Sequence, residues 1–232
     1  MKYDNWRIWE ADPSVEGSLY KRATGELPEM ESTKQLVELV KEVYKPEMKI
    51  LDVGSGPGHY YRGLKRINPS INYTGLDATK PYIEFAKNTF KGTSAQFIVG
   101  DIFDIPDELG KFDIVTCCNV ILHMPDFRIP IKNLLKSCKG YCFIRTLLSN
   151  HTFLHMFLYE DEFDEMNNPK KFVYQNTYSA GLIKNYINSL GDYSVQIIED
   201  KFNPGILDAE FHAVKKRDDV GTTRILNGLQ VS

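Results

Sequence analysis

A glycine-rich turn follows the first strong strand candidate, at residues 52–59, which read DVGSGPGH. Gly54, Gly56 and Gly58 allow a sharp turn and let a ligand lie against bare backbone, and free N–H groups of the next helix point to the same place. A dinucleotide fingerprint would need a third glycine at position 59, which is His, and a phosphate-gripping lysine is missing. The turn predicts a cofactor pocket and disfavours a nicotinamide-dependent oxidoreductase.

Three aspartates close three successive strand candidates. Asp52 lies in the first strand, and Asp77 ends the second, about 20 residues past the turn, where a carboxylate can accept bonds from both ribose hydroxyls. Asp101 ends the third, where a carboxylate can meet the adenine amine and Ile102 can cover the ring. Because parallel strands bring their carboxyl ends to one crevice, these residues predict a nucleoside-binding site.

The elements that position these residues alternate between strand and helix. A helix is predicted from Ser32, which has capping-box spacing with Gln35, to the stop at Pro46. Connections long enough for crossover helices separate the strand candidates and therefore predict a parallel sheet. The candidates are 49–53, 72–76, 96–99, 112–118 and 141–146.

The pattern changes after Asn150. Residues 151–177 contain no clean strand, and we interpret them as an insertion or lid. A helix is expected at 179–190, closed by Gly191 where a left-handed residue is favoured. Strands 195–198 and 211–214 are joined too closely for a helical crossover, so we expect them to pair antiparallel at a sheet edge.

Composition sets limits on the function. Hydrophobic residues make up 42% of the 232-residue chain and charged residues 25%, which is typical of a globular domain. A net charge of −3 provides no basic field for nucleic acid, no apolar run is long enough for a bilayer, and no secretory signal is apparent. We expect a cytoplasmic protein whose four cysteines are reduced core residues, with no metal-ligand spacing.

Residues 32–146 resemble the class I S-adenosylmethionine-dependent methyltransferases, particularly the small-molecule, ubiquinone-biosynthesis-like branch. The motifs that carry the resemblance are LDVGSGPGHY, GLDATK, GDIFDIP and FDIVTCCNVILHMPD. The resemblance implies one domain over 1–232 with a Rossmann-like, doubly wound α/β fold and a seven-stranded, mostly parallel sheet whose last strand is antiparallel. Its expected parts are an aromatic arm (1–31), the cofactor core (32–146), the lid (151–177), and a final helix and hairpin (178–215).

The resemblance also implies which residues hold S-adenosylmethionine. Asp52 would lie near its amino group, the glycine turn along its methionine part, and Asn119 beside the sulfonium. Arg22 of the arm would pair with the carboxylate, or else stay solvated on an arm that only packs on the sheet. The expected cofactor residues are Arg22, Asp52, Gly54, Ser55, Gly56, Gly58, Asp77, Ala78, Asp101, Ile102 and Asn119.

Methyl transfer is an in-line displacement that needs alignment more than acid–base chemistry. His123 is the candidate base, although a structural role near the cofactor is favoured for it. Arg145 could meet an anionic acceptor or pair with an acid. The candidate substrate-side residues are Tyr20, His123, Arg145, His151, His155 and Tyr178, with Tyr159 beside them in the lid.

The acceptor class follows from what the fourth-strand motif lacks. Nucleic-acid amino-methyltransferases of this fold usually have Asn/Asp-Pro-Pro-aromatic, whereas residues 118–121 read CNVI. We therefore expect transfer to an oxygen or nitrogen of a small metabolite or sugar derivative, by a monomer or homodimer that binds no metal, nucleic acid or membrane. A protein-directed methyltransferase and a non-catalytic cofactor-binding module are the alternatives.

Overall fold

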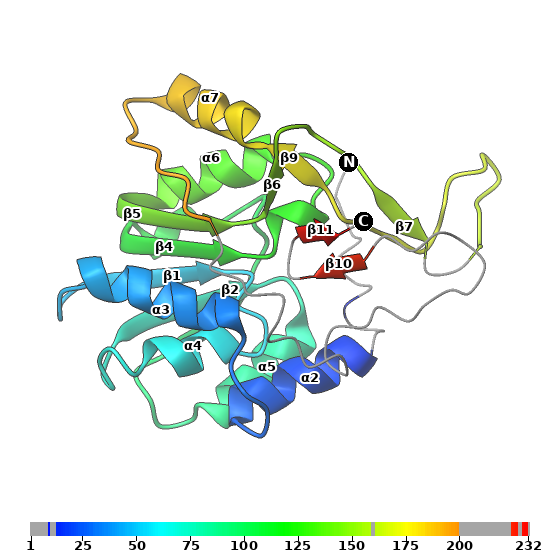
Figure 1. Ribbon diagram of the computed structural model, residues 1–232. Helices are drawn as coiled ribbons and strands as arrows, with labels where there is room; N and C mark the ends of the chain where they lie inside the picture. The colour runs from blue at the N-terminus through cyan, green and yellow to red at the C-terminus, as the bar shows by residue number, and fades with distance from the viewer. Residues whose placement is uncertain (1–8, 10–12, 159–160, 200–223, 227–228, 232) are drawn as a thin grey trace.

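The computed structural model describes residues 9, 13–158, 161–199, 224–226 and 229–231 (Figure 1). Its centre is a five-stranded, all-parallel sheet with strand order β3-β2-β1-β4-β5. From β1 the chain adds β2 and β3 on one side, and it then returns to add β4 and β5 on the other side. This change of direction between β1 and β4 places a crevice at their carboxyl ends. The strands are β1 (Lys49–Val53), β2 (Asn72–Asp77), β3 (Gln96–Val99), β4 (Phe112–Cys118) and β5 (Cys138–Arg145). The parallel α/β sheet is confirmed.

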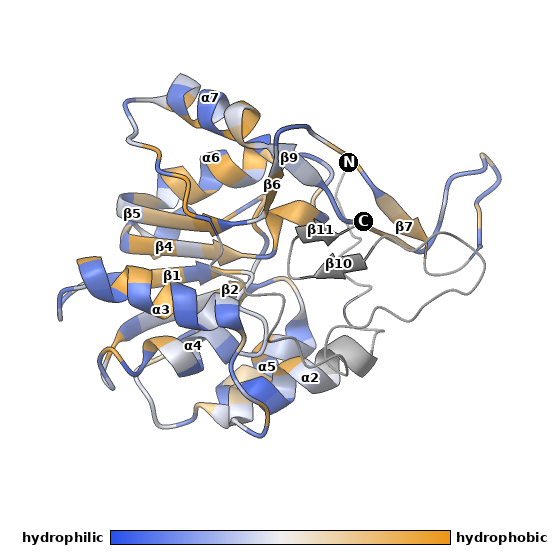
Figure 2. Ribbon diagram, in the orientation of Figure 1, coloured by the Kyte–Doolittle hydropathy of each residue, from blue (hydrophilic) through white to orange (hydrophobic). Residues whose placement is uncertain are grey.

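Helices cover both faces of this sheet (Figure 1). One core forms against α3 (Glu31–Val43), α4 (His59–Leu64) and α5 (Lys80–Thr89), and the other against α6 (Arg128–Ser137) and α7 (Ala180–Leu190). Successive strand residues alternate between them, so that Ile50 belongs to the first core and Leu51 to the second. Burial on both faces explains the apolar runs of β1 and β4 (Figure 2).

The helix predicted from Ser32 begins one residue earlier and uses no capping box. Met30 occupies the N-cap position and makes no side-chain cap bond. The Ser32 hydroxyl lies 3.1 Å from the hydroxyl of Tyr60. The helix ends at Val43, before the predicted stop at Pro46. A tertiary hydrogen bond to α4 has therefore replaced the local cap.

The arm contributes one described helix, α2 (Pro13–Thr24), which contacts α4 and α5. Tyr20 stacks on Phe85 of α5 with ring centroids 3.9 Å apart. Trp9 lies at the cavity described below, and Tyr82 donates a hydrogen bond to its carbonyl over 3.3 Å. The arm thus packs along the helices next to the crevice.

Residues 151–177 are more ordered than the pattern predicted. β6 (Leu147–Ser149) pairs in parallel with β9 (Thr177–Ser179), and β7 (Met156–Leu158) pairs antiparallel with β8 (Phe172–Tyr174). These are separate two-stranded sheets, and β7 points away from the central sheet in Figure 1. Short apolar triplets paired only with each other give too weak a periodic signal to be recognised as strands.

The C-terminal expectations need correction. Residues 195–198 are described but form no strand, because a strand requires a pairing partner and Ile197 and Ile198 are 47% and 44% exposed. The partner expected at 211–214 lies outside the described residues. Gly191 ends α7 with φ at 163°, which is extended backbone, so the predicted left-handed cap is wrong. β10 (Arg224–Leu226) and β11 (Leu229–Val231) form a separate antiparallel hairpin. Within the described chain the central sheet has five strands, not seven, and gains no antiparallel edge strand.

Three general features of the described residues set limits on the chemistry. Among the described helices, none combines the length and apolar character that crossing a membrane requires. Over the same residues, no group of three His, Cys, Asp or Glu side chains is placed to hold a metal ion. All four cysteines are free thiols, and Cys117 and Cys118 are buried in β4.

Candidate functional site

A cavity of about 240 Å³ opens at the carboxyl ends of the central strands. The ends of β1 to β4, the start of α4 and the arm all contribute to its wall. No lysine or arginine is among the described residues that line it, so the cavity lacks a phosphate clamp. The lining residues are Trp9, Leu19, Met30, Val53, Gly54, Gly56, His59, Tyr60, Leu76, Asp77, Ala78, Thr79, Tyr82, Gly100, Asp101, Ile102, Phe103, Cys118, Asn119, Val120, His123 and Met124.

The glycine turn forms one wall because only glycine fits its backbone. Gly54, Gly56 and Gly58 have φ of 76°, 53° and 88°. A Cβ on Gly54 would lie 2.1 Å from Val120, and one on Gly58 would lie 2.5 Å from Phe90. A Cβ on Gly56 would meet only the His59 ring, at 3.4 Å. Gly54 and Gly58 therefore serve packing, whereas Gly56 keeps the cavity wall bare.

Asp77, at the end of β2, holds the turn in place. Its two carboxylate oxygens accept hydrogen bonds from the backbone N–H groups of Gly56 and Thr79, each over 2.8 Å. Burial raises the pKa of Asp77, and the two N–H bonds oppose that rise. Each oxygen has a second lone pair, so the carboxylate can also accept from a ligand hydroxyl.

The next strand brings Asp101 and Ile102 to the same wall. Asp101 follows β3, and one of its oxygens accepts a hydrogen bond from the N–H of Phe103 over 2.9 Å. Ile102 is 5% exposed and belongs to the core beneath. The pair offers a carboxylate and an apolar surface side by side.

Asp52 is not among the residues that line the cavity. The residue is fully buried, and its oxygens accept hydrogen bonds from the hydroxyls of Tyr73 at 2.6 Å and Thr116 at 2.7 Å. Burial raises its pKa to about 6 despite these two bonds. The carboxylate ties β2 and β4 to β1, and its expected place near the cofactor's amino group stays a prediction.

Asn119 directly follows β4 and has a left-handed conformation, with φ at 60°. Its side-chain amide donates to the Tyr60 hydroxyl over 3.3 Å, and its carbonyl oxygen accepts a hydrogen bond from Arg145. Its backbone N–H donates to the Arg145 carbonyl over 2.9 Å. Arg145 thus fixes Asn119 from β5 and does not itself line the cavity.

His123 also lines the cavity, in the 3₁₀ turn η3 (Ile121–His123). Its Nδ1 lies 2.8 Å from the carbonyl oxygen of Tyr174, which can only accept, so Nδ1 carries the proton. The Trp9 ring packs edge-on, with centroids 4.8 Å apart. Burial lowers the pKa of His123 to about 4, so the ring is neutral at pH 7.

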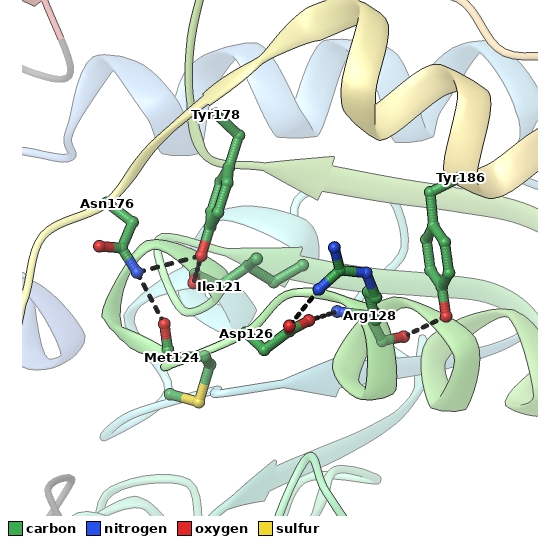
Figure 3. A network of polar contacts seen from close by, with 7 residues as sticks. All are labelled: Ile121, Met124, Asp126, Arg128, Asn176, Tyr178 and Tyr186. Carbon is green, nitrogen blue, oxygen red and sulfur yellow. Dashed lines mark hydrogen bonds and ion pairs between the residues drawn. The ribbon is translucent and has the colours of Figure 1, made fainter. Parts of the chain in front are cut away.

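Asn176 connects the 151–177 segment to this wall (Figure 3). Its fully buried side chain donates to the Met124 carbonyl over 2.8 Å and to the Tyr178 hydroxyl over 3.1 Å. Its oxygen accepts from the N–H of His155 over 3.1 Å, and its own N–H donates to the Leu122 carbonyl over 2.8 Å. One amide therefore joins the segment to the turn that carries His123.

The cavity brings together most of the predicted cofactor residues. Those that line it are Gly54, Gly56, Asp77, Ala78, Asp101, Ile102 and Asn119. Four do not: Asp52 is fully buried, Ser55 is buried with its hydroxyl 3.4 Å from the Gly56 carbonyl, Gly58 packs on Phe90, and Arg22 lies in the last turn of α2.

Of the predicted substrate residues that the structure describes, only His123 lines the cavity. Tyr20 is held on α5, and Tyr178 is a core residue, 1% exposed, whose hydroxyl donates to the Ile121 carbonyl over 3.4 Å. His151 and His155 are exposed, with rings beside Phe153. Tyr159 lies outside the described residues.

The sequence interpretation missed several lining residues. Trp9 and Tyr82 reach the cavity by tertiary packing, which leaves no local signal. Thr79 lies two residues after Asp77, and its N–H bond to that carboxylate is an ordinary Asx-type turn. His59 was noted only as the residue that breaks a dinucleotide pattern, although its place after the last turn glycine puts it at the cavity.

Known proteins resemble this chain over the same region. A family model described as a methyltransferase domain matches residues 44–201. The demethylmenaquinone methyltransferase of Thermotoga maritima is 36% identical over 106 residues, 46% of this chain and 43% of that protein. A ubiquinone biosynthesis O-methyltransferase of Vibrio parahaemolyticus is 32% identical over 111 residues, 44% and 45% of the two chains. This chain thus spans less than half the length of these two relatives.

A solved structure extends the likeness to most of the fold. The magnesium protoporphyrin IX methyltransferase of Synechocystis PCC 6803, crystallised with bound S-adenosylmethionine, aligns with a TM-score of 0.57 and 16% identity. The alignment covers 87% of this chain and 93% of that one. At this identity the likeness concerns the fold.

Proposed function

The chain belongs to the methyltransferase domain family, and from this premise we propose that it transfers a methyl group from S-adenosylmethionine to an oxygen or nitrogen of a small-molecule acceptor. The observation that carries the proposal is the cavity, where a bare glycine turn and two strand-terminal carboxylates face one space, with no lysine or arginine among the described residues that line it. This set fits a nucleoside that has no phosphate. S-adenosylmethionine is such a nucleoside, and its sulfonium supplies a methyl group to a nucleophile.

The residues of the cavity have separate tasks in this proposal. Asp77 accepts hydrogen bonds from the ribose hydroxyls while it continues to hold Gly56 and Thr79, so that ribose binding and the shape of the turn depend on one carboxylate. Asp101 meets the adenine amine and Ile102 covers the ring. Asn119, fixed by Tyr60 and Arg145, lies near the reacting centre.

No base is required of the chain. His123 has its pKa lowered to about 4, which makes its imidazole a weak proton acceptor at neutral pH. Its bond to the Tyr174 carbonyl and its packing on Trp9 support a positioning role at the cavity wall. Alignment of acceptor and methyl group supplies the rate enhancement.

We propose further that the 151–177 segment selects the acceptor. Tyr174 and Asn176 bind residues of the cavity wall through main-chain and amide hydrogen bonds, so the segment starts from the edge of the cavity. Its exposed side chains include Phe153, Met156 and Phe157, which are 43–44% exposed. An apolar surface on a segment anchored at the cavity wall suits an acceptor with an apolar part.

The test combines binding with turnover. Isothermal titration calorimetry of the whole chain with S-adenosylhomocysteine should give one site, and NAD(H) should give no heat. Methyl transfer from S-adenosylmethionine labelled at the methyl group is then measured against a panel of hydroxylated and aminated metabolites. Absence of binding by both S-adenosylmethionine and S-adenosylhomocysteine would refute the proposal. Binding with no transfer to any class of acceptor, including proteins, would favour a non-catalytic module.

A further inference from the structure

A run of exposed apolar side chains in the 151–177 segment has no task in cofactor binding. More than half of the large apolar side chains that are exposed in the described chain lie between Leu148 and Met166. Five of them lie within six successive residues and are 41–65% exposed: Phe153, Leu154, Met156, Phe157 and Leu158. β7 is hydrophobic although it lies outside the central sheet (Figure 2). Exposed apolar groups of this extent mark an interaction surface.

Residues 153–158 form one edge strand, which continues β7 toward its N-terminus. The edge strand pairs with residues 172–177 in a single antiparallel register, from Phe153 opposite Thr177 to the end of β7. Within the described chain, no strand pairs with its other side. The main-chain groups on that side are therefore available to a partner strand.

The hydrogen bonds of the edge strand show which of its main-chain groups point outward. The N–H of Phe153 donates to the Thr177 carbonyl over 2.8 Å, so the main-chain groups of Phe153 face the paired strand. This direction alternates from residue to residue in an antiparallel strand. Leu154, Met156 and Leu158 therefore direct their N–H and carbonyl groups to the open side. None of these three is a charged residue or a proline that would hinder pairing.

The other side of the paired strand, residues 172–177, is occupied by η3. The N–H of Asn176 donates to the Leu122 carbonyl over 2.8 Å, and the Tyr174 carbonyl oxygen lies 2.8 Å from Nδ1 of His123. The ribbon thus has one open edge in the described structure. When two such ribbons pair through their open edges, the assembly closes as a dimer and does not grow into a fibre.

We propose that the edge strand pairs antiparallel with the edge strand of a second copy of the chain, which gives a symmetric dimer with a joint four-stranded sheet. Full overlap of the outward-facing residues fixes the register. Met156 lies on the twofold axis and faces its own counterpart, and Leu154 of each copy faces Leu158 of the other. Each of these pairs exchanges two main-chain hydrogen bonds, and apolar side chains meet apolar side chains. The inference does not depend on the proposed function, because pairing uses the edge of the ribbon and not the cavity.

The charges beside the edge strand favour a second copy over a lipid surface. The turn that follows the strand carries four carboxylates and two lysines: Asp161, Glu162, Asp164, Glu165, Lys170 and Lys171. Insertion of the strand into a bilayer would bring this net negative charge toward the acyl chains, which is costly. In the antiparallel dimer the two acidic turns lie at opposite ends of the joint sheet and do not repel each other at close range. Each turn instead lies at the end where the other copy carries His151.

Sedimentation velocity of the whole chain tests the dimer. Between about 1 and 300 µM the sedimentation coefficient of the wild type should rise from a monomer value to a dimer value, because a small interface gives micromolar affinity. Met156→Lys should stay monomeric throughout, since it places two lysines opposite each other at the twofold axis. Ile129→Lys is the matched control, because it adds the same charge to a side chain of α6 that is 54% exposed and lies outside the edge strand. This control should dimerise like the wild type.

A mixing experiment tests the register. Leu154→Lys combined with Leu158→Lys, and Leu154→Glu combined with Leu158→Glu, should each be monomeric, because like charges then face each other in both pairs. An equimolar mixture of the two double variants should associate at least about tenfold more tightly than either alone, since attractive pairs replace repulsive ones. Circular dichroism establishes that each variant is folded.

Four outcomes overturn the inference, and none of them touches the proposed function, because no cofactor is present in these measurements. The first is a wild type that is monomeric at every concentration. The second is a monomeric wild type that co-sediments with phosphatidylcholine vesicles, which identifies a lipid surface as the partner. The third is a dimer that persists in Met156→Lys, which places the interface elsewhere. The fourth is a mixture of the double variants that associates no better than its components, which excludes the symmetric register.

Discussion

The buried carboxylate of Asp52 allows a quantitative prediction about stability and pH. Asp52→Asn keeps the size of the side chain and removes its ionisation. The pKa of Asp52 is about 6 in the fold, against an ordinary value of 3.8. At about 1.4 kcal/mol per pH unit, this difference corresponds to roughly 3 kcal/mol. This is the stability that the fold loses at a pH where Asp52 is ionised in both states, because the Asp52 carboxyl ionises more easily in the unfolded chain than in the fold.

The sign follows from proton binding. Between pH 4 and 6 the folded protein keeps the Asp52 proton while the unfolded chain releases it, so this group makes the fold less stable as pH rises. Above pH 6 both states are ionised and the loss is constant. Asp52→Asn lacks this titration. Its free energy of unfolding should therefore gain roughly 2–3 kcal/mol relative to the wild type between pH 4 and 7.

Urea unfolding at pH 4, 5, 6 and 7, followed by circular dichroism, measures this difference. Titration of His59 and His123 is common to both proteins and cancels. Asp113→Asn is the matched control, because the Lys49 N–H and then Lys139 lower the pKa of Asp113 and its contribution is lost as pH falls. The free energy of unfolding of Asp113→Asn should fall relative to the wild type as pH rises, which is the opposite trend. A pH-independent difference for Asp52→Asn would mean that Asp52 is ionised in the fold and would refute the reasoning.

Three other predictions concern the cavity. Gly56→Val should abolish binding of S-adenosylmethionine in calorimetry while the protein stays folded. Its Cβ meets only the His59 ring, at 3.4 Å, and the positive φ costs about 1–2 kcal/mol. Retained binding would contradict this prediction. Asp77→Ala should weaken S-adenosylmethionine and S-adenosylhomocysteine about tenfold or more, and unchanged affinity excludes ribose recognition there. His151→Ala and His155→Ala should alter acceptor turnover and spare cofactor binding, whereas parallel loss of both makes the segment structural cover.

The central sheet could be predicted from sequence because its signals are local. Each parallel strand is buried on both faces, so it reads as a short apolar run, and a crossover helix with its own period follows. Asp77 and Asp101 were found for the same reason: the end of such a strand marks the crevice. Sequence order alone was enough to bring these two carboxylates together.

The errors occurred where tertiary contacts decide the outcome. Ser32 has the local features of a helix cap, but its hydroxyl lies beside Tyr60, 28 positions later in the chain. Residues 195–198 have strand composition but no pairing partner in the described chain. The sequence also did not show that hydroxyls from two neighbouring strands donate to the Asp52 carboxylate, and the expected place of Asp52 near the cofactor's amino group stays a prediction. A sequence pattern shows which interactions a residue can make, and the tertiary structure decides with which partner it makes them.

The contacts of Asn176 allow the cofactor cavity and the 151–177 segment, which is proposed to select the acceptor, to be tested separately. Its buried amide fixes the 151–177 segment to the Leu122 and Met124 carbonyls through bonds that do not involve the exposed side chains of that segment. His155 contributes to this anchor only its backbone N–H, which an alanine substitution leaves in place. Changes to the exposed rings therefore leave the cavity wall, and with it the cofactor contacts, unaltered. An effect of these substitutions on turnover can then be assigned to the acceptor.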